Sequence, residues 1–387
     1  MSLQYILGGS GSGKSTYLYN SIIKEAVWNP SMDYIIVVPE QYTMATQKRV
    51  VELHPRRGIL NIDVVSFERL AYKVFEEVGA TDYPVLDDTG KNLIVRRVLE
   101  QNKKSLRFFE SNISNTGFVS ELKSVISELL QYDIDVDKLQ EINKNVDNNS
   151  LLGMKLDDIA LIYGGFKSFI KDHYITSEEI LDLMCRKVRE SERIKGSVIA
   201  FDGFTGFTPV QYRLIGILLD MCNMVQVTLT IDAREQVNVN EGIEKLFYMT
   251  KDTVAHLNRI CDEQHIDIEK VVVSDIAANA NGKAAACKEV AEKNTRFAAS
   301  KELAFLEQNI FRPGAGYYKG KVNDLVMYAG ITPKDEIQYV AGEILRLTRL
   351  LGYRYKEIAV VTGDIAVYGK LAANIFAQND IPYFLDQ

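Results

Sequence analysis

Short apolar runs and longer amphipathic runs alternate along this chain. The apolar runs have the length of buried β-strands, and most are followed by a turn and by apolar positions three and four residues apart, the spacing of a helix. Strands that alternate with helices predict an α/β fold built on a parallel sheet. The predicted sheet strands are Tyr5–Leu7, Tyr34–Val38, Ile62–Val65, Ser197–Phe201 and Val225–Leu229.

Three other stretches depart from this alternation. Residues 81–194 contain amphipathic runs such as Leu93–Leu99 and Phe118–Ile126, which predict a helical insertion. Residues 276–296 are rich in alanine and polar residues, which predicts a surface segment; a loop that contacts DNA is the alternative. From residue 325 the alternation resumes, with strands predicted at 325–328 and 358–361 and helices at 336–350 and 368–377.

The composition narrows the classes of protein. At 387 residues, 47% hydrophobic and 25% charged, the chain is ordinary globular material with room for two or three domains. No apolar run approaches the roughly 20 residues of a membrane helix, so we expect a soluble, cytoplasmic protein. The net charge of −7 argues against a generally basic nucleic-acid-binding surface. The four cysteines and four histidines are scattered singly, so no metal site is predicted from them.

The strongest motif follows the first predicted strand. It reads G-x-x-x-x-G-K-[ST] between a strand and a helix, the context that a P-loop requires. Its glycines let backbone N–H groups point at phosphate oxygens, its lysine reaches the β- and γ-phosphates, and its first hydroxyl binds Mg²⁺. A glycine-rich turn without a ligand is the alternative. The motif predicts a site for ATP or ADP with Mg²⁺ at Gly8, Gly9, Ser10, Gly11, Ser12, Gly13, Lys14, Ser15 and Thr16.

A carboxylate at the end of a later strand is the second part of this predicted site. Asp202 follows the apolar run 197–201, and the carboxyl ends of parallel strands are where ligands of such sheets gather. We therefore expect Asp202 to hold the Mg²⁺ ion together with Ser15. The next residue is Gly203, which has no side chain to activate a water molecule.

These motifs in this order resemble superfamily 1 helicases. Ser66–Ala71 is similar to the Thr-Phe-His segment of that group, and Asp202–Gln211 is similar to its Asp-Glu-Phe-Gln-Asp segment. The chain departs from the pattern at Gly203, where the group has its catalytic glutamate. The glutamine that reads adenine has no room before Gln4, and 358–364 lacks the expected arginine. The resemblance implies a RecA-like domain that binds nucleotide and is not a motor, so we predict no catalytic residue.

Four further segments narrow the resemblance to the N-terminal part of AddB, one of the two proteins that make up AddAB helicase/nucleases. That family processes double-strand DNA ends for recombinational repair, recognises Chi in single-stranded DNA and pairs with an AddA-type motor protein. Its nuclease and iron–sulfur cluster are expected only in a C-terminal part absent from these 387 residues. The segments are Val37–Thr43, Lys155–Tyr163, Phe305–Phe311 and Ile381–Asp386.

The resemblance also implies a domain organisation. Residues 1–80 and 195–310 are expected to form the first RecA-like domain, 81–194 the helical insertion, and 325–387 the truncated start of a second RecA-like domain.

Contacts to DNA are harder to assign. Phe67 stands where helicase relatives stack a base, and Arg69 lies on the helix that follows. Tyr42 and Thr43 are further candidates. For all four the alternative is an ordinary core or solvated side chain.

Two other functions stay open. In one, the chain is an active P-loop ATPase or nucleotide kinase that uses another carboxylate as its base, and Glu40 at the end of the second strand is the best candidate. In the other, the loop is a structural remnant that binds nothing.

Overall fold

The structure is a computed structural model. It describes all residues except 80–83, 114, 148–149, 172, 233–234, 240–241, 270–271, 274–296, 298, 313, 315 and 386–387. The chain divides into two compact units, Met1–Ala298 and Ala299–Gln387. The alanine-rich segment 276–296, predicted to lie on the surface, falls outside the described residues.

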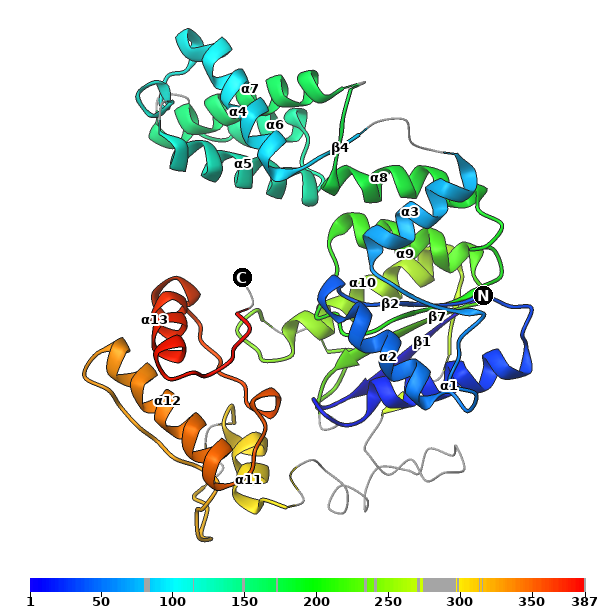
Figure 1. Ribbon diagram of the computed structural model, residues 1–387. Helices are drawn as coiled ribbons and strands as arrows, with labels where there is room; N and C mark the ends of the chain where they lie inside the picture. Colours follow the sequence, from blue (N-terminus) through cyan, green and yellow to red (C-terminus); the bar gives the residue numbers. More distant parts are fainter. Residues whose placement is uncertain are drawn as a thin grey trace. The chain divides into compact units, whose positions relative to one another are not determined.

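A parallel β-sheet forms the centre of the first unit (Figure 1). Its strands run in the order β3-β2-β6-β7-β1, and β8 and β9 both pair with β1. The α/β, RecA-like fold predicted from the sequence is therefore confirmed. The bounds of the strands are β1 (Ser2–Gly8), β2 (Tyr34–Val37), β3 (Ile62–Val65), β6 (Val198–Phe201), β7 (Met224–Thr230), β8 (Asp267–Ile268) and β9 (Val272–Val273).

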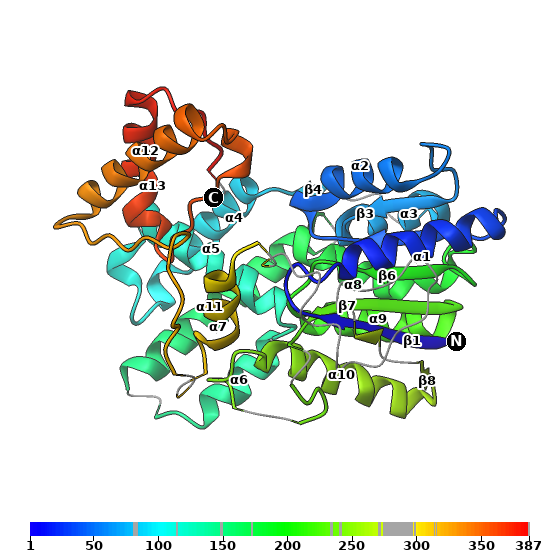
Figure 2. The same ribbon diagram turned by 90° about the horizontal axis from the view of Figure 1, so that it is seen from below.

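Helices cover both faces of this sheet (Figure 2). Because successive side chains of a strand point to opposite faces, Tyr5 and Leu7 of β1 pack with one helical layer and Ile6 packs with the other. One layer is made by α1 (Lys14–Trp28) and α2 (Thr43–Leu53). The other is made by α3 (Phe67–Val78), α8 (Ser177–Lys187), α9 (Pro209–Met221) and α10 (Tyr248–Gln264).

The helices between α3 and α8 bury a core of their own. Val95, Tyr163 and Phe166 are fully buried in it, and none of them belongs to the cores on the two faces of the sheet. A short parallel pair, β4 (Val85–Leu86) and β5 (Ile175–Thr176), joins the two ends of this helical segment. Its helices are α4 (Asp88–Asn102), α5 (Thr116–Gln131), α6 (Val136–Lys144) and α7 (Leu151–Ile170).

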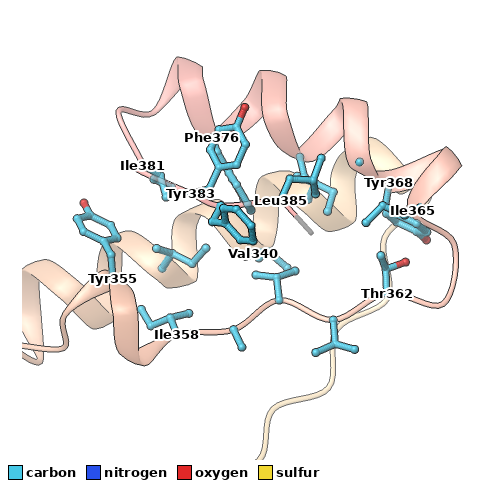
Figure 3. Close-up of a pocket in the computed structure, with 18 of the residues that line it drawn as sticks. Val340, Tyr355, Ile358, Thr362, Ile365, Tyr368, Phe376, Ile381, Tyr383 and Leu385 are labelled. Carbon is cyan, nitrogen blue, oxygen red and sulfur yellow. The ribbon is translucent and has the colours of Figure 1, made fainter. Parts of the chain in front are cut away.

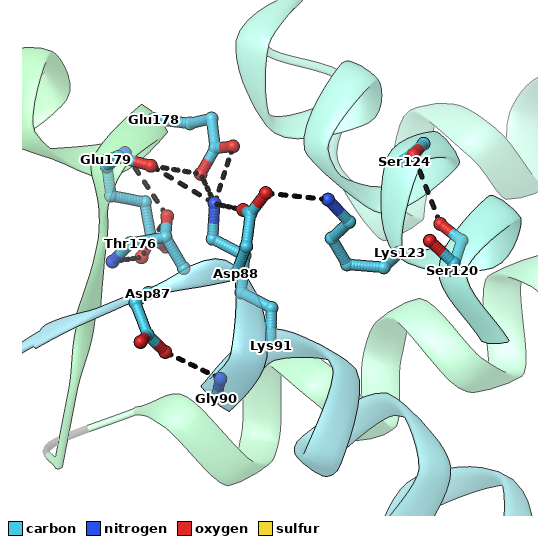
Figure 4. A network of polar contacts seen from close by, with 11 residues as sticks. Asp87, Asp88, Gly90, Lys91, Ser120, Lys123, Ser124, Thr176, Glu178 and Glu179 are labelled. Atoms are coloured by element: carbon cyan, nitrogen blue, oxygen red, sulfur yellow. Dashed lines mark hydrogen bonds and ion pairs between the residues drawn. The ribbon is translucent and has the colours of Figure 1, made fainter. Parts of the chain in front are cut away.

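A buried lysine ties the helical segment to α8 (Figure 4). Lys91 of α4 is 3% exposed, and its Nζ donates to both carboxylate oxygens of Glu178 at 2.8 and 2.9 Å and to Ser177 Oγ at 3.1 Å. Burial raises the pKa of Glu178, but the hydrogen bonds from Lys91, from a backbone N–H and from Ser127, together with the charge of Lys91, outweigh it, so the pKa lies below its ordinary value. Lys123 of α5 pairs with Asp88 at 3.0 Å beside this contact.

The second unit contains α11 (Lys301–Asn309), α12 (Pro333–Leu350) and α13 (Ile365–Gln378). The two predicted helices are confirmed, but the strands predicted at 325–328 and 358–361 are wrong, because neither segment pairs in a ladder with any described residue. An apolar run favours a strand, yet a strand forms only with a hydrogen-bonding partner. Segment 358–363 instead lines an apolar pocket of about 910 Å³ between α12 and α13 (Figure 3).

Candidate nucleotide-binding site

The P-loop connects β1 to α1 at the carboxyl edge of the sheet. Gly11 and Gly13 have φ values of +76° and +93°, which favour glycine, and the N–H of Ser12 donates to the carbonyl of Gly9 at 3.1 Å. Gly13 is the N-cap of α1 and supplies no side-chain cap, and the first turn of α1 has no acidic residue. This N-terminus therefore keeps its partial positive charge for an anion.

Lys14 lies folded over the loop. Its Nζ donates to the carbonyl oxygens of Gly8 at 3.0 Å and Gly9 at 2.9 Å. Burial lowers the pKa of Lys14, and the charge of Asp202 opposes this shift. Because both hydrogen-bond partners are neutral carbonyls, they do not cancel the positive charge that a phosphate would meet.

Asp202 is surrounded by hydroxyl groups and is 4% exposed. Its Oδ1 accepts from Ser15 Oγ at 3.0 Å and from Thr228 Oγ1 at 2.6 Å, and its Oδ2 accepts from the hydroxyl of Tyr19 at 2.5 Å. Since Ser15 donates its proton to Asp202, the lone pairs of its oxygen stay available to a cation. This donor set fits Mg²⁺, and Ser15 and Asp202 are the residues that would hold the ion.

The sequence motifs did not point to Tyr19 and Thr228. A helical signal for Tyr19 existed, because it stands four residues after Ser15 and therefore on the same face of α1. Thr228 is one of three polar residues that alternate with apolar residues along β7, the others being Gln226 and Thr230. Its partner could not be known before β7 was placed beside β6.

Gly203 follows Asp202 with a φ of +80°, in the left-handed region. A Cβ at this position would lie 3.6 Å from Cδ of Pro39 and 3.9 Å from Cδ2 of Tyr42. It would thus point toward the turn after β2, whereas the P-loop strand lies on the opposite side of β6. The space allows a side chain here, but the backbone does not favour one.

The residues considered for DNA contact lie near that turn. Phe67 is 7% exposed, and its ring centroid lies 5.5 Å from that of Phe201 and 5.3 Å from that of Phe204. Tyr42 is half exposed and Thr43 is buried. A role of these residues in DNA binding stays a prediction.

Arg69 and Glu40 form an ion pair across the two turns that follow β2 and β3. The Nη2 of Arg69 lies 3.1 Å from Oε1 of Glu40, and both side chains are about half exposed. Arg69, a candidate for DNA binding, and Glu40, the alternative candidate for the catalytic base, are therefore each already paired with an opposite charge.

Other kinds of site find little support in the described part of the chain. Its histidines, cysteines and carboxylates form no group of three or more that could hold a metal ion. No described helix combines the length and the apolar character that a membrane span requires.

Comparisons with known proteins identify the family of this chain. A family model described as "ADDB, N-terminal" matches residues 5–307. The B subunit of the ATP-dependent helicase/deoxyribonuclease of Lachnoclostridium phytofermentans is 40% identical over 386 residues, which are 100% of this chain and 32% of that protein. The corresponding B subunits of Clostridium perfringens and Caldanaerobacter subterraneus are each 33% identical, again over 100% of this chain and 32% of theirs. The chain thus spans about a third of the length of these relatives, and it belongs to the family of AddB N-terminal regions.

Proposed function

We propose that this chain is the nucleotide-binding, helicase-like part of an AddB-type protein. It binds ATP or ADP with Mg²⁺ at the P-loop and does not act as a motor. The observation that carries the proposal is the contact between the Ser15 hydroxyl and Asp202, at the end of a loop that presents Lys14 and an uncapped helix N-terminus.

Each group has a defined role in binding. The loop amides and Lys14 hold the phosphates, and Ser15 and Asp202 hold the cation, which neutralises phosphate charge when bound. A glycine at position 203 offers no general base, a contribution worth roughly 10²–10⁴ in rate. Its left-handed φ of +80° also disfavours any other residue there. The site is therefore suited to binding nucleotide and poorly suited to hydrolysing it.

The larger assembly follows from the relatives. Each is named as the B subunit of an ATP-dependent helicase/deoxyribonuclease, so we propose an AddA-type partner protein and DNA ends as the substrate of the whole complex. In the same proposal the helicase-like part takes part in the recognition of Chi on single-stranded DNA. Strong binding to DNA by this chain alone is not expected, because its net charge is −7.

A titration with a fluorescent ATP analogue tests the nucleotide site. Lys14→Ala should weaken binding at least tenfold, or about 1.4 kcal/mol. Lys24→Ala is the matched control, because Lys24 is an exposed lysine of the same helix. Equal binding by wild type and Lys14→Ala, or none by the wild type, would refute the proposal.

Hydrolysis separates the proposal from its rival. We expect wild-type ATP hydrolysis to stay near background with or without single-stranded DNA and Mg²⁺. Robust hydrolysis that disappears in Glu40→Gln would instead establish an active ATPase with Glu40 as its base.

A further inference from the structure

Tyr19 makes a close contact to the magnesium side of the site. It lies on α1 one turn after Ser15, its side chain is buried at 6% exposure, and its hydroxyl donates to Asp202 Oδ2 at 2.5 Å. Tyr19 lies outside the P-loop motif, so it does not belong to the phosphate-binding loop. Its contact with the site is the hydrogen bond to Asp202.

The Asp202 carboxylate is held at both of its oxygens by different elements. Thr228 of β7 donates to Oδ1 at 2.6 Å, and Tyr19 of α1 donates to Oδ2 at 2.5 Å. With both oxygens anchored, the carboxylate plane cannot rotate without losing a buried hydrogen bond, a loss that costs about 1–3 kcal/mol. Ser15 consequently finds its acceptor, Oδ1, in a fixed position.

From these contacts we propose that Tyr19 is a positioning residue for Mg²⁺ in this nucleotide site. It fixes the Asp202 carboxylate and through it the Ser15 hydroxyl, so that the cation-binding pair is assembled before the nucleotide arrives. This inference rests on the proposed nucleotide-binding function. It predicts that Tyr19 affects the Mg²⁺-dependent part of binding and leaves the contacts of Lys14 and the loop unchanged.

The test compares nucleotide affinity with Mg²⁺ and with EDTA, using the same fluorescent analogue. Tyr19→Phe removes one hydroxyl and should reduce the gain in affinity that Mg²⁺ brings by roughly 10–100-fold, the usual effect of losing a partner of a metal ligand. Affinity in EDTA should not change. Tyr17→Phe, the same substitution two residues earlier on α1, is the matched control and should leave both affinities as in the wild type.

Three outcomes would overturn the inference. The first is a Mg²⁺-dependent gain in Tyr19→Phe equal to that of the wild type, even if the variant unfolds at a lower temperature, because a merely structural role predicts that result. The second is wild-type binding that requires Lys14 but not Mg²⁺, which leaves nucleotide binding at the P-loop standing. The third is wild-type binding that does not require Lys14, which overturns both.

If Tyr19→Phe does not fold, Thr228→Val tests the same carboxylate from β7. This substitution removes the anchor of Oδ1 and keeps the shape of the side chain. It should also reduce the Mg²⁺-dependent gain, and an unchanged gain would contradict a carboxylate positioned by these two hydroxyls.

Discussion

The left-handed backbone at Gly203, at the edge of the sheet where the site lies, can be tested by the stability of a variant. In Gly203→Ala the new Cβ would meet Pro39 at 3.6 Å and Tyr42 at 3.9 Å, which are ordinary contact distances, so no clash is expected. The cost comes from φ of +80°, where an L-residue is disfavoured by about 1–2 kcal/mol. Alanine also stiffens the unfolded chain, which returns about 0.4–1 kcal/mol. The net loss of stability should be about 1 kcal/mol.

Thermal unfolding followed by circular dichroism measures this loss. A change of about 1 kcal/mol should lower the Tm of the unit that contains Gly203 by roughly 2–4 °C. Gly203→Asn is the control, because asparagine tolerates the left-handed region better and should lower the Tm less. If Gly203→Ala unfolds at or above the wild-type temperature, the left-handed backbone at this position is wrong.

Gly203→Glu extends the test to chemistry. On this backbone the side chain begins toward Pro39 and Tyr42, on the side of β6 away from the P-loop strand. We therefore expect ATP hydrolysis to remain near background in Gly203→Glu. A hundredfold rise in the rate of hydrolysis would show that position 203 can present a base to the nucleotide, contrary to this geometry.

Further predictions concern the helical segment. Lys91→Met should lower the free energy of unfolding by about 3–5 kcal/mol in urea titrations, because it leaves the Glu178 carboxylate without its buried partner. The double variant Lys91→Met with Glu178→Leu should recover part of that loss. Equal stability of the single and the double variant would contradict a coupled pair. Folding lowers the pKa of Glu178, so the ionised carboxylate should stabilise the protein above its ordinary pKa of 4.5, and this stabilisation should be lost as the pH falls below that value. Urea titrations across this range should show that the free energy of unfolding falls less with acid in Lys91→Met than in the wild type. Asp158, 1% exposed, accepts the N–H groups of Arg107, Phe108 and Phe109 at 2.8–3.0 Å, so Asp158→Ala should cost about 3 kcal/mol, and a cost under about 1 kcal/mol would refute this role.

The parts of the site that lie within one strand, loop and helix were predictable from the sequence. The loop needs glycines at positions 11 and 13 for their backbone angles and a lysine at position 14 for its side chain. These requirements fall within a few consecutive residues, so the sequence motif shows them directly. Asp202 was predictable for a related reason, because any carboxylate at the end of a parallel strand reaches the same edge of the sheet. Its pairing with Ser15 across 187 residues follows from that rule.

Long-range partners were not predictable in the same way. The strands expected at 325–328 and 358–361 have suitable apolar residues, but strand formation depends on a second segment to pair with, and none is present among the described residues. The buried pairing of Lys91 with Glu178 likewise joins helices 87 residues apart. A charged residue in an amphipathic pattern looks like a solvated surface residue until its partner is in place.

The sequence by itself determined that this chain has a P-loop on a parallel α/β sheet, an acidic strand end and a glycine after it, since each of these depends on neighbours in the chain. Only the tertiary structure decided that Tyr19 and Thr228 hold Asp202 at both oxygens and that the backbone at Gly203 is left-handed. The physical reason is that a hydrogen bond depends on the final positions of atoms within a few ångströms. Those positions are set by the packing of α1, β6 and β7 together.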